Sequence, residues 1–413
     1  MGRLLNAALK ALALYAGLLL ATAHTGRSAE LDLSVELRAV SSDATATRLG
    51  GGLGKLRYDG AHEGLRFGYL RLGYRGDITP TLRFAAEAVS YGDHDVNPID
   101  LTEAYLDWRP IPASAWRSRL KVGAFYPEIS LENRMRGWRS PYTLSFSAIN
   151  TWVGEELRTI GAEYNLDWLG LAHGHNFEVS SGVAAFGWND PAGTVVGSRG
   201  WALHDRQTTL FGRFAHRGQP LPERTVFFDD LDKRAGYSIN TSLRYRGLFE
   251  VRALHYDNRA RLGVAAASIN DATWETYFDS IGARWTPSPS WTAIAQWLHG
   301  RTLLDAPQPA NAWSFGSHFL LVSNTQGRWR YSARYDSFAV DQTNSDFAEY
   351  IGGIYFNERG HAWTLAVQRS CGPHWNVTLE GLQVDSNVEQ RALLGQPDVA
   401  RERQLQLALR YER

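Results

Sequence analysis

The chain has 413 residues, of which 21% are charged, 44% hydrophobic and 12% aromatic, and its formal net charge at pH 7 is zero. This composition excludes a disordered chain and a bundle of helical membrane spans. Because nucleic-acid-binding domains carry a clear excess of Lys and Arg, the charge balance also argues against a nucleic-acid partner.

The N-terminus is the one continuously apolar stretch of the sequence. Two basic residues supply a positive start, residues 11–20 form an apolar core, and a small-x-small run follows at 21–23. This pattern predicts a secretory signal peptide over residues 1–23, with cleavage before His24 and Ala29 as the alternative position. A buried N-terminal helix is the other interpretation, but so short an apolar core with these flanks is typical of export signals.

Export would place the mature chain in an oxidising compartment, yet it has one cysteine, Cys371, and cannot form an internal disulfide. Its stability must therefore come from other interactions. Four of the 43 basic residues are lysines, namely Lys10, Lys55, Lys121 and Lys233. Arginine keeps its charge in any environment, so it suits fixed charge on a wall. A genomic bias towards arginine would produce the same count.

Short segments of alternating apolar and polar residues recur along nearly the whole mature chain. The segments 31–38, 68–76 and 81–88 alternate in this way, and a tight turn at 76–80 separates the last two. Successive side chains of a strand point to opposite faces. Each segment therefore predicts a strand with one apolar and one polar face.

The clearest alternation lies in residues 237–246 and 328–336. In both segments one face carries aliphatic and aromatic residues, with Tyr or Trp near its ends, and the other carries Ser, Asn, Arg or Asp. Such a polar face is poor material for the dry core of a β-sandwich. It suits a wall between lipid and water, in which lipid-facing residues alternate with lumen-facing ones.

The last predicted strand, residues 404–413, alternates to the end of the chain, with three leucines and Tyr411 on one face. This segment resembles the C-terminal strand that marks outer-membrane barrels. It departs from that pattern at its final residue, which is Arg413 where an aromatic residue is usual. Tyr411 is the candidate to replace the missing aromatic.

Connections between the predicted strands alternate between short and long. Short turns lie at 286–290 and 369–374. Longer polar stretches lie at 41–63, 127–156, 188–205, 258–273, 301–311 and 386–401. Short periplasmic turns and long external loops are a property of bacterial barrels. The alternation slips near 217–235 and 339–361.

A backbone in lipid must pair all of its N–H and C=O groups, so the sheet has to close on itself. Single-chain bacterial barrels have an even number of strands. The sequence therefore predicts an all-β fold, a transmembrane antiparallel β-barrel of about 16 strands over residues 24–413, with about 18 strands as the alternative. The predicted location is the bacterial outer membrane, with outer-membrane lipid around the barrel.

Residues 127–158 form the longest interval without strand-like alternation. Their functional groups are the basic Arg134, Arg136 and Arg139, the aromatic Trp138, Tyr142 and Trp152, and the acidic Glu155 and Glu156. Three arginines so close together repel one another and need a reason to be adjacent. We expect a long loop that folds into the barrel and forms its constriction.

Three motifs accompany this loop: Glu-Ala-Tyr-Leu-Asp at 103–107, Leu-Lys-Val-Gly-Ala-Phe-Tyr-Pro at 120–127 and Arg-Thr-Ile-Gly-Ala-Glu at 158–163. They resemble the corresponding strands of the phosphate-selective porin O and P family, and the rest of the chain shares the rhythm of that family. The resemblance implies a porin-like barrel, a homotrimer and an anion pathway in which lysines are prominent. Because this chain has so few lysines, phosphate is carried over only as one candidate solute.

The residues that set the field of a pore are those at its narrow part, where rings of Arg or Lys favour anions. The basic candidates on lumen faces are Arg71, Arg244, Arg246, Arg330, Arg334 and Arg410, besides Arg134, Arg136 and Arg139 of the loop. The acidic candidates are Glu87, Glu103, Asp107, Glu163, Glu250, Asp279, Asp336 and Glu380. For a single wall arginine, an ion pair that braces the wall is the favoured alternative.

Other chemistries have weaker signals. Trp138, Tyr142 and Trp152 form a candidate slide for sugars, although girdle and packing roles explain most tryptophans. The sequence has no G-x-S-x-G, H-E-x-x-H or P-loop motif. His173 and His175 lack an obvious third metal ligand. We therefore expect no catalytic residue, no cofactor and no metal site.

Together these patterns predict an outer-membrane porin, not an enzyme. It would allow passive diffusion of small polar solutes through a water-filled lumen, with a mild preference for anions. Two alternatives stay open at this point. One is an outer-membrane enzyme that acts on lipid or glycan, and the other is an export barrel for a charged polysaccharide.

Overall fold

The computed structural model describes residues 29–92, 99–212, 214–215, 224–264, 272–305, 311–343 and 353–413. The predicted signal peptide lies outside these residues and stays a prediction. Within the described ranges, no helix combines the length and the apolar character that crossing a membrane would need.

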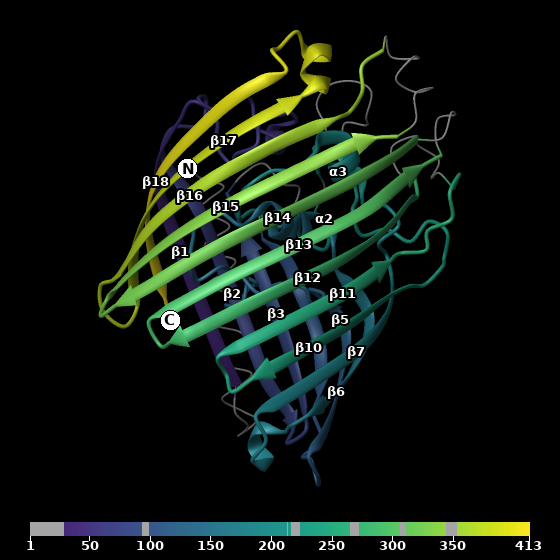
Figure 1. The fold of residues 1–413 in the computed structure, drawn as a ribbon, viewed down its shortest axis with the longest axis vertical. Coiled ribbons are helices and arrows are strands. Elements are labelled where there is room, and N and C mark those ends of the chain that lie inside the picture. Colours follow the sequence, from purple (N-terminus) through teal and green to yellow (C-terminus); the bar gives the residue numbers. More distant parts are fainter. Residues whose placement is uncertain are drawn as a thin grey trace.

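Sixteen antiparallel strands form a closed barrel (Figure 1). The strands are β1 (Ala29–Ser42), β2 (Gly64–Thr79), β3 (Leu82–Ser90), β4 (Asp100–Trp108), β5 (Trp116–Phe125), β6 (Thr159–Trp168), β7 (Phe177–Gly187), β10 (Gly236–Tyr245), β11 (Phe249–Asp257), β12 (Trp274–Ser288), β13 (Trp291–Leu304), β14 (Asn311–Gln326), β15 (Trp329–Gln342), β16 (Glu358–Ser370), β17 (Trp375–Val388) and β18 (Val399–Glu412). A separate pair, β8 (Phe214–Ala215) and β9 (Arg224–Thr225), lies outside the barrel sheet. The predicted fold and the count of 16 strands are confirmed.

The first and last strands close the sheet, because β1 pairs with β18 from Ser34 opposite Glu412 to Ser42 opposite Gln404. All other strands of the barrel pair with their sequence neighbours, and β7 pairs directly with β10. The terminal strand therefore has a full partner on each side, and the backbone of the barrel has no open edge.

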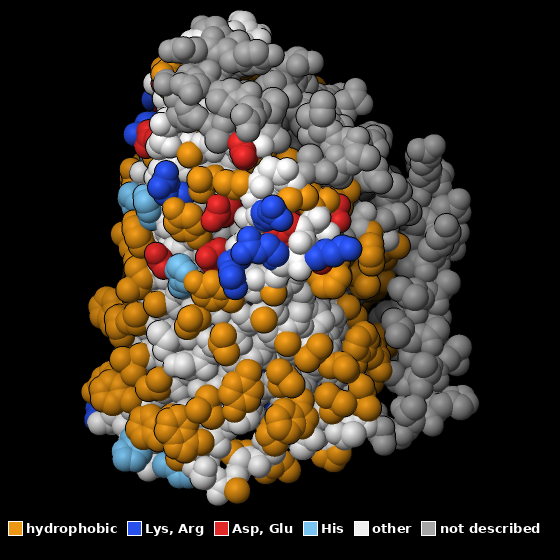
Figure 2. Space-filling model, turned by 90° about the vertical axis from the view of Figure 1, so that its right-hand side faces the viewer, with side chains coloured by type: hydrophobic (Ala, Val, Ile, Leu, Met, Phe, Trp, Pro, Cys, Tyr) orange, Lys and Arg blue, Asp and Glu red, His pale blue; other side chains and the backbone are white. Residues whose placement is uncertain are grey.

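The predicted alternation is confirmed along β18, where Leu405 and Leu407 are exposed on the outside and Gln404 and Gln406 are buried on the inside. Exposed Leu, Val, Trp and Tyr side chains on the other strands extend this apolar surface around the barrel. Figure 2 shows hydrophobic side chains gathered over the lower part of one face, with a belt of charged residues above them. An apolar band below a charged belt is what a lipid-facing wall requires.

One end of the barrel carries short turns and the other carries long connections. The short-turn end has the connections 80–81, 109–115, 169–176, 246–248, 289–290, 327–328 and 371–374. The long-loop end has the connections 43–63, 91–99, 126–158, 188–235, 258–273, 305–310, 343–357 and 389–398. The two regions where the predicted alternation slipped overlap the long-loop connections 188–235 and 343–357. The contrast in length has an exception, because the connection 305–310 is shorter than 109–115 and 169–176 at the other end.

The interior of the barrel contains a large apolar core, which sequence patterning did not predict. It unites the inner faces of β12 to β17 with residues of the long loops 43–63, 126–158 and 188–212. At its centre, the ring of Trp152 lies 5.2 Å from that of Phe278, 5.1 Å from that of Phe315 and 6.0 Å from that of Trp201. The expectation of a polar inner face is wrong on this side, because the inner faces of these strands also carry large apolar residues such as Phe278, Phe315 and Leu382.

The acidic residue Asp279 was assigned to the lumen, and this assignment is wrong. Its carboxylate is on the outer face of β12, where 68% of the side chain is exposed and Nδ1 of His255 lies 2.8 Å away. Inward positions of β12 are filled by Phe278 and Ser280 instead. The segment 274–288 alternates with polar residues on both faces near the long-loop end, so polarity alone did not reveal which face was inside.

The interior core should be the main source of folding stability. We expect Trp152→Ala to lower the free energy of unfolding by about 3–5 kcal/mol, because it removes a large buried ring and leaves a cavity. The measurement is the urea midpoint of the purified barrel in detergent. The matched control is Trp285→Ala, which removes an outward ring that is 54% exposed. Equal midpoints for the two variants would contradict the role given to the core.

Candidate functional site

The loop 126–158 lies inside the barrel and contains the helix α2 (Ala148–Glu156) (Figure 1). Ser147 caps this helix, since its side chain accepts a hydrogen bond from the backbone N–H of Asn150. Before the helix, Gly137 and Trp138 both have positive φ values, 65° and 51°, and reverse the chain. The ring of Trp138 stacks on that of Tyr126 with centroids 4.3 Å apart. The first half of the loop is thus folded back on its own beginning.

Arg334 joins this loop to the wall. It points inward from β15, is fully buried, and forms ion pairs of 2.8 Å with Glu132 and 2.7 Å with Asp336. Its remaining N–H groups donate to the carbonyl oxygens of Ser145 and Phe146 at 2.7 and 2.9 Å. The guanidinium is therefore saturated, and Arg334 acts as an anchor for the loop and not as a contact for solutes.

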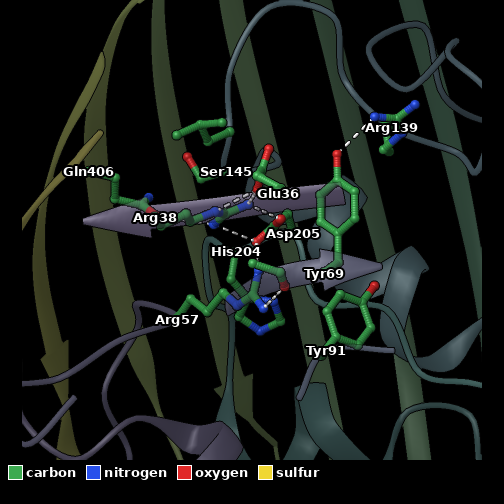
Figure 3. A network of polar contacts seen from close by, with 12 residues as sticks. Glu36, Arg38, Arg57, Tyr69, Tyr91, Arg139, Ser145, His204, Asp205 and Gln406 are labelled. Carbon is green, nitrogen blue, oxygen red and sulfur yellow. Dashed lines mark hydrogen bonds and ion pairs between the residues drawn. The ribbon is translucent and has the colours of Figure 1, made fainter. Parts of the chain in front are cut away.

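A second buried network joins the wall to two other loops (Figure 3). Asp205, from the connection 188–235, is paired with Arg38 of β1 and lies 2.9 Å from Arg57 of the connection 43–63. Arg38 also pairs with Glu36, which in turn lies 2.8 Å from Arg410. Although burial raises the pKa of Asp205, Arg38 and Arg57 hold it well below its ordinary value. Asp205 therefore stays charged, and this network fixes both loops against β1.

A third network lies at the end of α2. Glu155 pairs with Arg48 of the connection 43–63, and Nε2 of His204 lies 3.0 Å from its other oxygen. Glu156 accepts a hydrogen bond of 2.8 Å from the backbone N–H of Val195, in α3 (Thr194–Arg199). Burial raises the pKa of Glu156 from 4.5 to about 8. Three loops thus meet at two adjacent glutamates, one charged and one neutral near pH 7.

Below these networks, towards the short-turn end, the lumen is hollow. A cavity of about 430 Å³ lies between residues 126–138 of the loop and the inner faces of β2, β4, β5, β10 and β11. A smaller hollow of about 120 Å³ adjoins it and shares Arg119, Glu128, Arg244 and Arg252 with its lining. We call the two together the vestibule.

Basic residues outnumber acidic ones in the lining of the larger cavity. The basic residues around the larger cavity are Arg75, Arg119, Lys121, Arg134, Arg136, Arg244 and Arg252. The acidic residues around it are Glu103 and Glu128. Side chains of one sign in a cleft with low-dielectric walls concentrate ions of the opposite sign. Each of these seven basic side chains also lies within 4.0 Å of a carboxylate, so part of the positive charge of the lining is neutralised by ion pairs.

Three of the predicted site residues line the vestibule, namely Arg134, Arg136 and Arg244. Arg134 Nη2 lies 2.8 Å from Glu250, and Arg136 Nη2 lies 2.6 Å from Glu30. The side chains of Arg136 and Arg244 are 41% and 44% exposed, although Arg136 is also paired with Asp32 and Nη1 of Arg244 lies 3.6 Å from Glu178. These two are the best candidates for direct solute contact.

The other predicted site residues lie elsewhere. Arg139 is buried, and its Nη1 lies 2.6 Å from Glu412, so the loop's three arginines do not act as one cluster. Arg330 donates to the carbonyl oxygen of Pro141 at 2.6 Å. Arg246 follows β10 in a turn at the short-turn end, with a φ of 49°, and is not a wall residue. With Arg334 and Arg410, the residues Arg139 and Arg330 brace the loop and the wall.

Arg71 is buried where the wall meets two loops. It donates to the hydroxyl of Tyr91 at 3.0 Å and to Oε1 of Gln207 at 2.5 Å. Gln207 in turn donates to the carbonyl oxygens of Gly137 and Trp138, both at 3.1 Å. Arg71 therefore supports the vestibule through Gln207, at the point where the loop reverses.

Sequence reasoning missed several vestibule residues, namely Arg75, Arg119, Lys121 and Arg252. Their positions in the strands could have revealed them, because each one lies an even number of residues from an inward residue of its own strand, and residues two apart in a strand share a face. Arg75 is four residues from Arg71 in β2, and Arg252 is two residues from Glu250 in β11. Parity would have placed them inside the barrel, although it could not have shown that they share one cavity.

The aromatic residues of the loop do not line a sugar path. Trp138, Tyr142 and Trp152 are all buried and belong to the interior core. Their rings pack against the wall and the neighbouring loops, although Trp138, which is 9% exposed, also lines the larger cavity of the vestibule. Packing is therefore the role that the structure assigns to them.

Two candidate metal-binding groups differ in their geometry. His173 and His175 lie in the exposed turn between β6 and β7, as expected. In the described part of the chain, one group of carboxylates has oxygens within 4.8 Å of one another, formed by Asp190, Asp230 and Asp232. Asp190 accepts hydrogen bonds from the backbone of its own loop, including one of 3.0 Å from Asp232. This cluster offers oxygen ligands, and its hydrogen bonds also order the loop.

No protein-family model and no curated protein sequence matches this chain. The fold matches solved structures. The outer membrane channel DcaP of Acinetobacter baumannii is similar with a TM-score of 0.56 and 11% identity, over 94% of this chain and 98% of that chain. OmpF of Salmonella typhi, in complex with daunomycin, has a TM-score of 0.52 and 11% identity over 94% and 98%.

An anion-selective porin from Comamonas acidovorans is also similar, with a TM-score of 0.51 and 12% identity, over 94% of this chain and 100% of that chain. At these identities the likeness establishes the fold alone, which is a porin-like outer-membrane β-barrel. The narrower resemblance to the phosphate-selective porin O and P family stays a prediction.

Removing the anchor at Arg334 should be costly. We expect Arg334→Met to lower the free energy of unfolding by about 3–5 kcal/mol, because it leaves Glu132 and Asp336 buried without a counter-charge. The control is Arg330→Met. Arg330 lies four residues from Arg334 on the same face of β15 and makes one hydrogen bond to a carbonyl oxygen of the loop. Urea unfolding of both variants measures the difference. An equal loss in both would show that Arg334 is no special anchor.

Glu156 should make stability depend on pH. It keeps its proton in the folded state up to about pH 8, whereas the unfolded chain loses it near 4.5. The contribution is fully present below pH 4.5 and is lost as the pH rises through about 8, because the unfolded state binds fewer protons in that window. Glu156→Gln should make the melting temperature less dependent on pH over this range. Asp398→Asn, at an exposed position, should leave the pH dependence as it is in the unmodified protein. An unchanged slope in Glu156→Gln would contradict the assignment.

Proposed function

We propose that this protein is an outer-membrane porin through which small polar solutes diffuse passively, with a preference for anions. The observation that carries the proposal is the arginine-rich vestibule beside an inward-folded loop, inside a closed barrel with an apolar outer band. By the general orientation of bacterial barrels, the short-turn end would face the periplasm and the long-loop end would face outwards.

The anion preference would come from charge that is fixed before a solute arrives. Arg75, Arg119 and Arg252 project from three different strands, and each is held on a wall that cannot move away from the cavity. Arg136 and Arg244 add guanidinium groups that are more accessible. Because the loop and the wall both supply cations, an anion would meet guanidinium groups on more than one side of the vestibule.

The proposed pathway is narrow. Between the vestibule and the long-loop end, the described residues include Tyr126, Trp138, Arg158 and Gln207, which are all buried. The interior core occupies the side of β12 to β17. The proposed path for a solute runs along the boundary between the loop 126–138 and the strands β2 to β5, where the hydrogen bonds of Arg71 to Gln207 and of Gln207 to the loop narrow it further. We expect low conductance and a low size limit compared with a wide, water-filled barrel.

The test is single-channel recording in planar bilayers. We expect stable ohmic steps of small size, with a reversal potential in a salt gradient that shows anion preference. The double variant Arg136→Gln with Arg244→Gln should reduce the anion-to-cation permeability ratio by about twofold or more, because an exposed charge in water contributes about 1 kcal/mol or less. Arg359→Gln, on the outer surface beside Asp341, is the matched control.

Each result separates the possibilities. Silent bilayers from folded protein would remove the porin proposal. Channels whose selectivity is the same in the double variant would place the selective region outside the vestibule. A change in the outer-surface control as large as that in the double variant would show that surface charge, and not the vestibule, sets the selectivity.

A further inference from the structure

The outer wall of the barrel contains a hollow centred on Gly381 of β17. Gly381 pairs with Leu365 of β16 on one side and with Leu405 of β18 on the other. These leucines are 62% and 53% exposed, so they stand as ridges on each side of a residue without a side chain. A Cβ atom added at Gly381 would meet one neighbouring atom, Cδ1 of Leu405, at 4.0 Å. Glycine at this position therefore leaves open space on the lipid side.

The hollow is part of a longer groove. One section of about 430 Å³ and another of about 510 Å³ share Leu365, Gly381 and Leu405. We call the two together the Gly381 groove. From Gly381 it extends on one side to Arg403 and on the other to Tyr331.

The groove crosses the apolar band from one edge to the other. At its lower end Trp291 and Tyr331 lie within the first residues of β13 and β15, next to the short-turn end. At its upper end Arg403 lies two residues beyond Leu405, towards the long-loop end, where outward residues of β18 change from leucine to arginine. A groove of this orientation runs along the direction in which acyl chains lie in a bilayer.

The upper end of the groove carries Arg403, whose guanidinium forms no ion pair among the described residues, and beside it the carboxylate of Asp43. The Nε of Arg403 donates to Oε1 of Gln383 at 3.1 Å, and its backbone N–H donates to Asp43. In contrast, Arg401, two residues away on the same face, lies 2.5 Å from Asp385. The Nη1 and Nη2 groups of Arg403 are therefore available to an anion at the edge of the apolar band.

We propose that the Gly381 groove is a binding site for a phosphate-bearing membrane lipid. One acyl chain lies in the groove between Leu365 and Leu405, and the phosphate accepts hydrogen bonds from Arg403. The apolar ridges exclude water along the chain, and the planar fork of arginine matches two phosphate oxygens. A lipid fits better than a second protein copy, since the groove joins a narrow apolar channel to one cation at headgroup depth.

The proposed lipid site is independent of the pore. The groove lies on the outside of β13 to β18, whereas the inner faces of these strands pack against the interior core. Lipid binding can therefore be measured in detergent whether or not the protein conducts ions.

The experiment uses native mass spectrometry of the folded full-length mature chain in detergent. The probe is phosphatidylglycerol, and diacylglycerol with the same chains is the phosphate-free analogue. We expect one tightly held phosphatidylglycerol per barrel. Gly381→Leu should weaken it about tenfold, because the new side chain displaces several methylene groups of the lipid. Ala333→Leu narrows the groove from β15 and should act in the same direction.

Matched variants control for general effects on the surface. Ala295→Leu adds the same side chain at an exposed outward position of β13 outside the groove, and it should bind like the unmodified protein. Arg403→Gln should weaken phosphatidylglycerol about tenfold and leave diacylglycerol unchanged. Arg369→Gln, at the opposite edge of the band above the ring of Trp329, should have no such effect.

Three results would overturn the proposal. Unchanged binding in both Gly381→Leu and Ala333→Leu would remove the groove as the site. Equal losses for both lipids in Arg403→Gln would remove the phosphate contact. A lipid-free pair of chains that Gly381→Leu dissociates would assign the groove to a second copy of this protein.

Discussion

The constraint on which the rest of this structure depends is that a β-sheet in lipid cannot leave an edge unpaired. The pairing of β1 with β18 satisfies it by closing the sheet. Once the barrel is closed, each strand has a lipid side and an interior side. The vestibule and the interior core lie on the interior side, where strands meet the loops and water. The outer groove lies on the side that meets lipid.

The inner face of the barrel has two different kinds of contact on its two sides. Strands β12 to β17 turn apolar residues inwards and pack them on the long loops, as a soluble protein packs its core. Strands β2, β4, β5, β10 and β11 turn charged residues inwards around a hollow. Loop 126–158 lies between these two halves. Its aromatic residues join the core, and its first arginines face the hollow.

Buried ion pairs hold the loops in place in a chain that cannot form a disulfide. Arg334, Arg38 and Arg48 each connect a loop to the wall or to another loop. Such pairs add little net stability over an apolar core, because desolvation offsets much of their attraction. These pairs instead determine where the loops lie, since a loop placed elsewhere would leave a buried charge without its partner and raise the free energy of the folded state. They favour one arrangement of loops over the many that an apolar core alone would tolerate.

The sequence by itself determined the all-β class, the closed barrel, the lipid-facing side of most strands and the inward position of the long loop. These features depend on local alternation and on loop length, which are visible within each segment. Only the tertiary structure decided the roles of the arginines. Arg334 and Glu132 are far apart in the chain, and a buried anchor looks the same in sequence as a pore-lining residue.

The same limit explains the errors at Asp279 and Arg246. Which polar residues meet across the barrel, which ones lie above the apolar band and which ones fall in a turn depends on the register of neighbouring strands, and register is a property of the closed sheet.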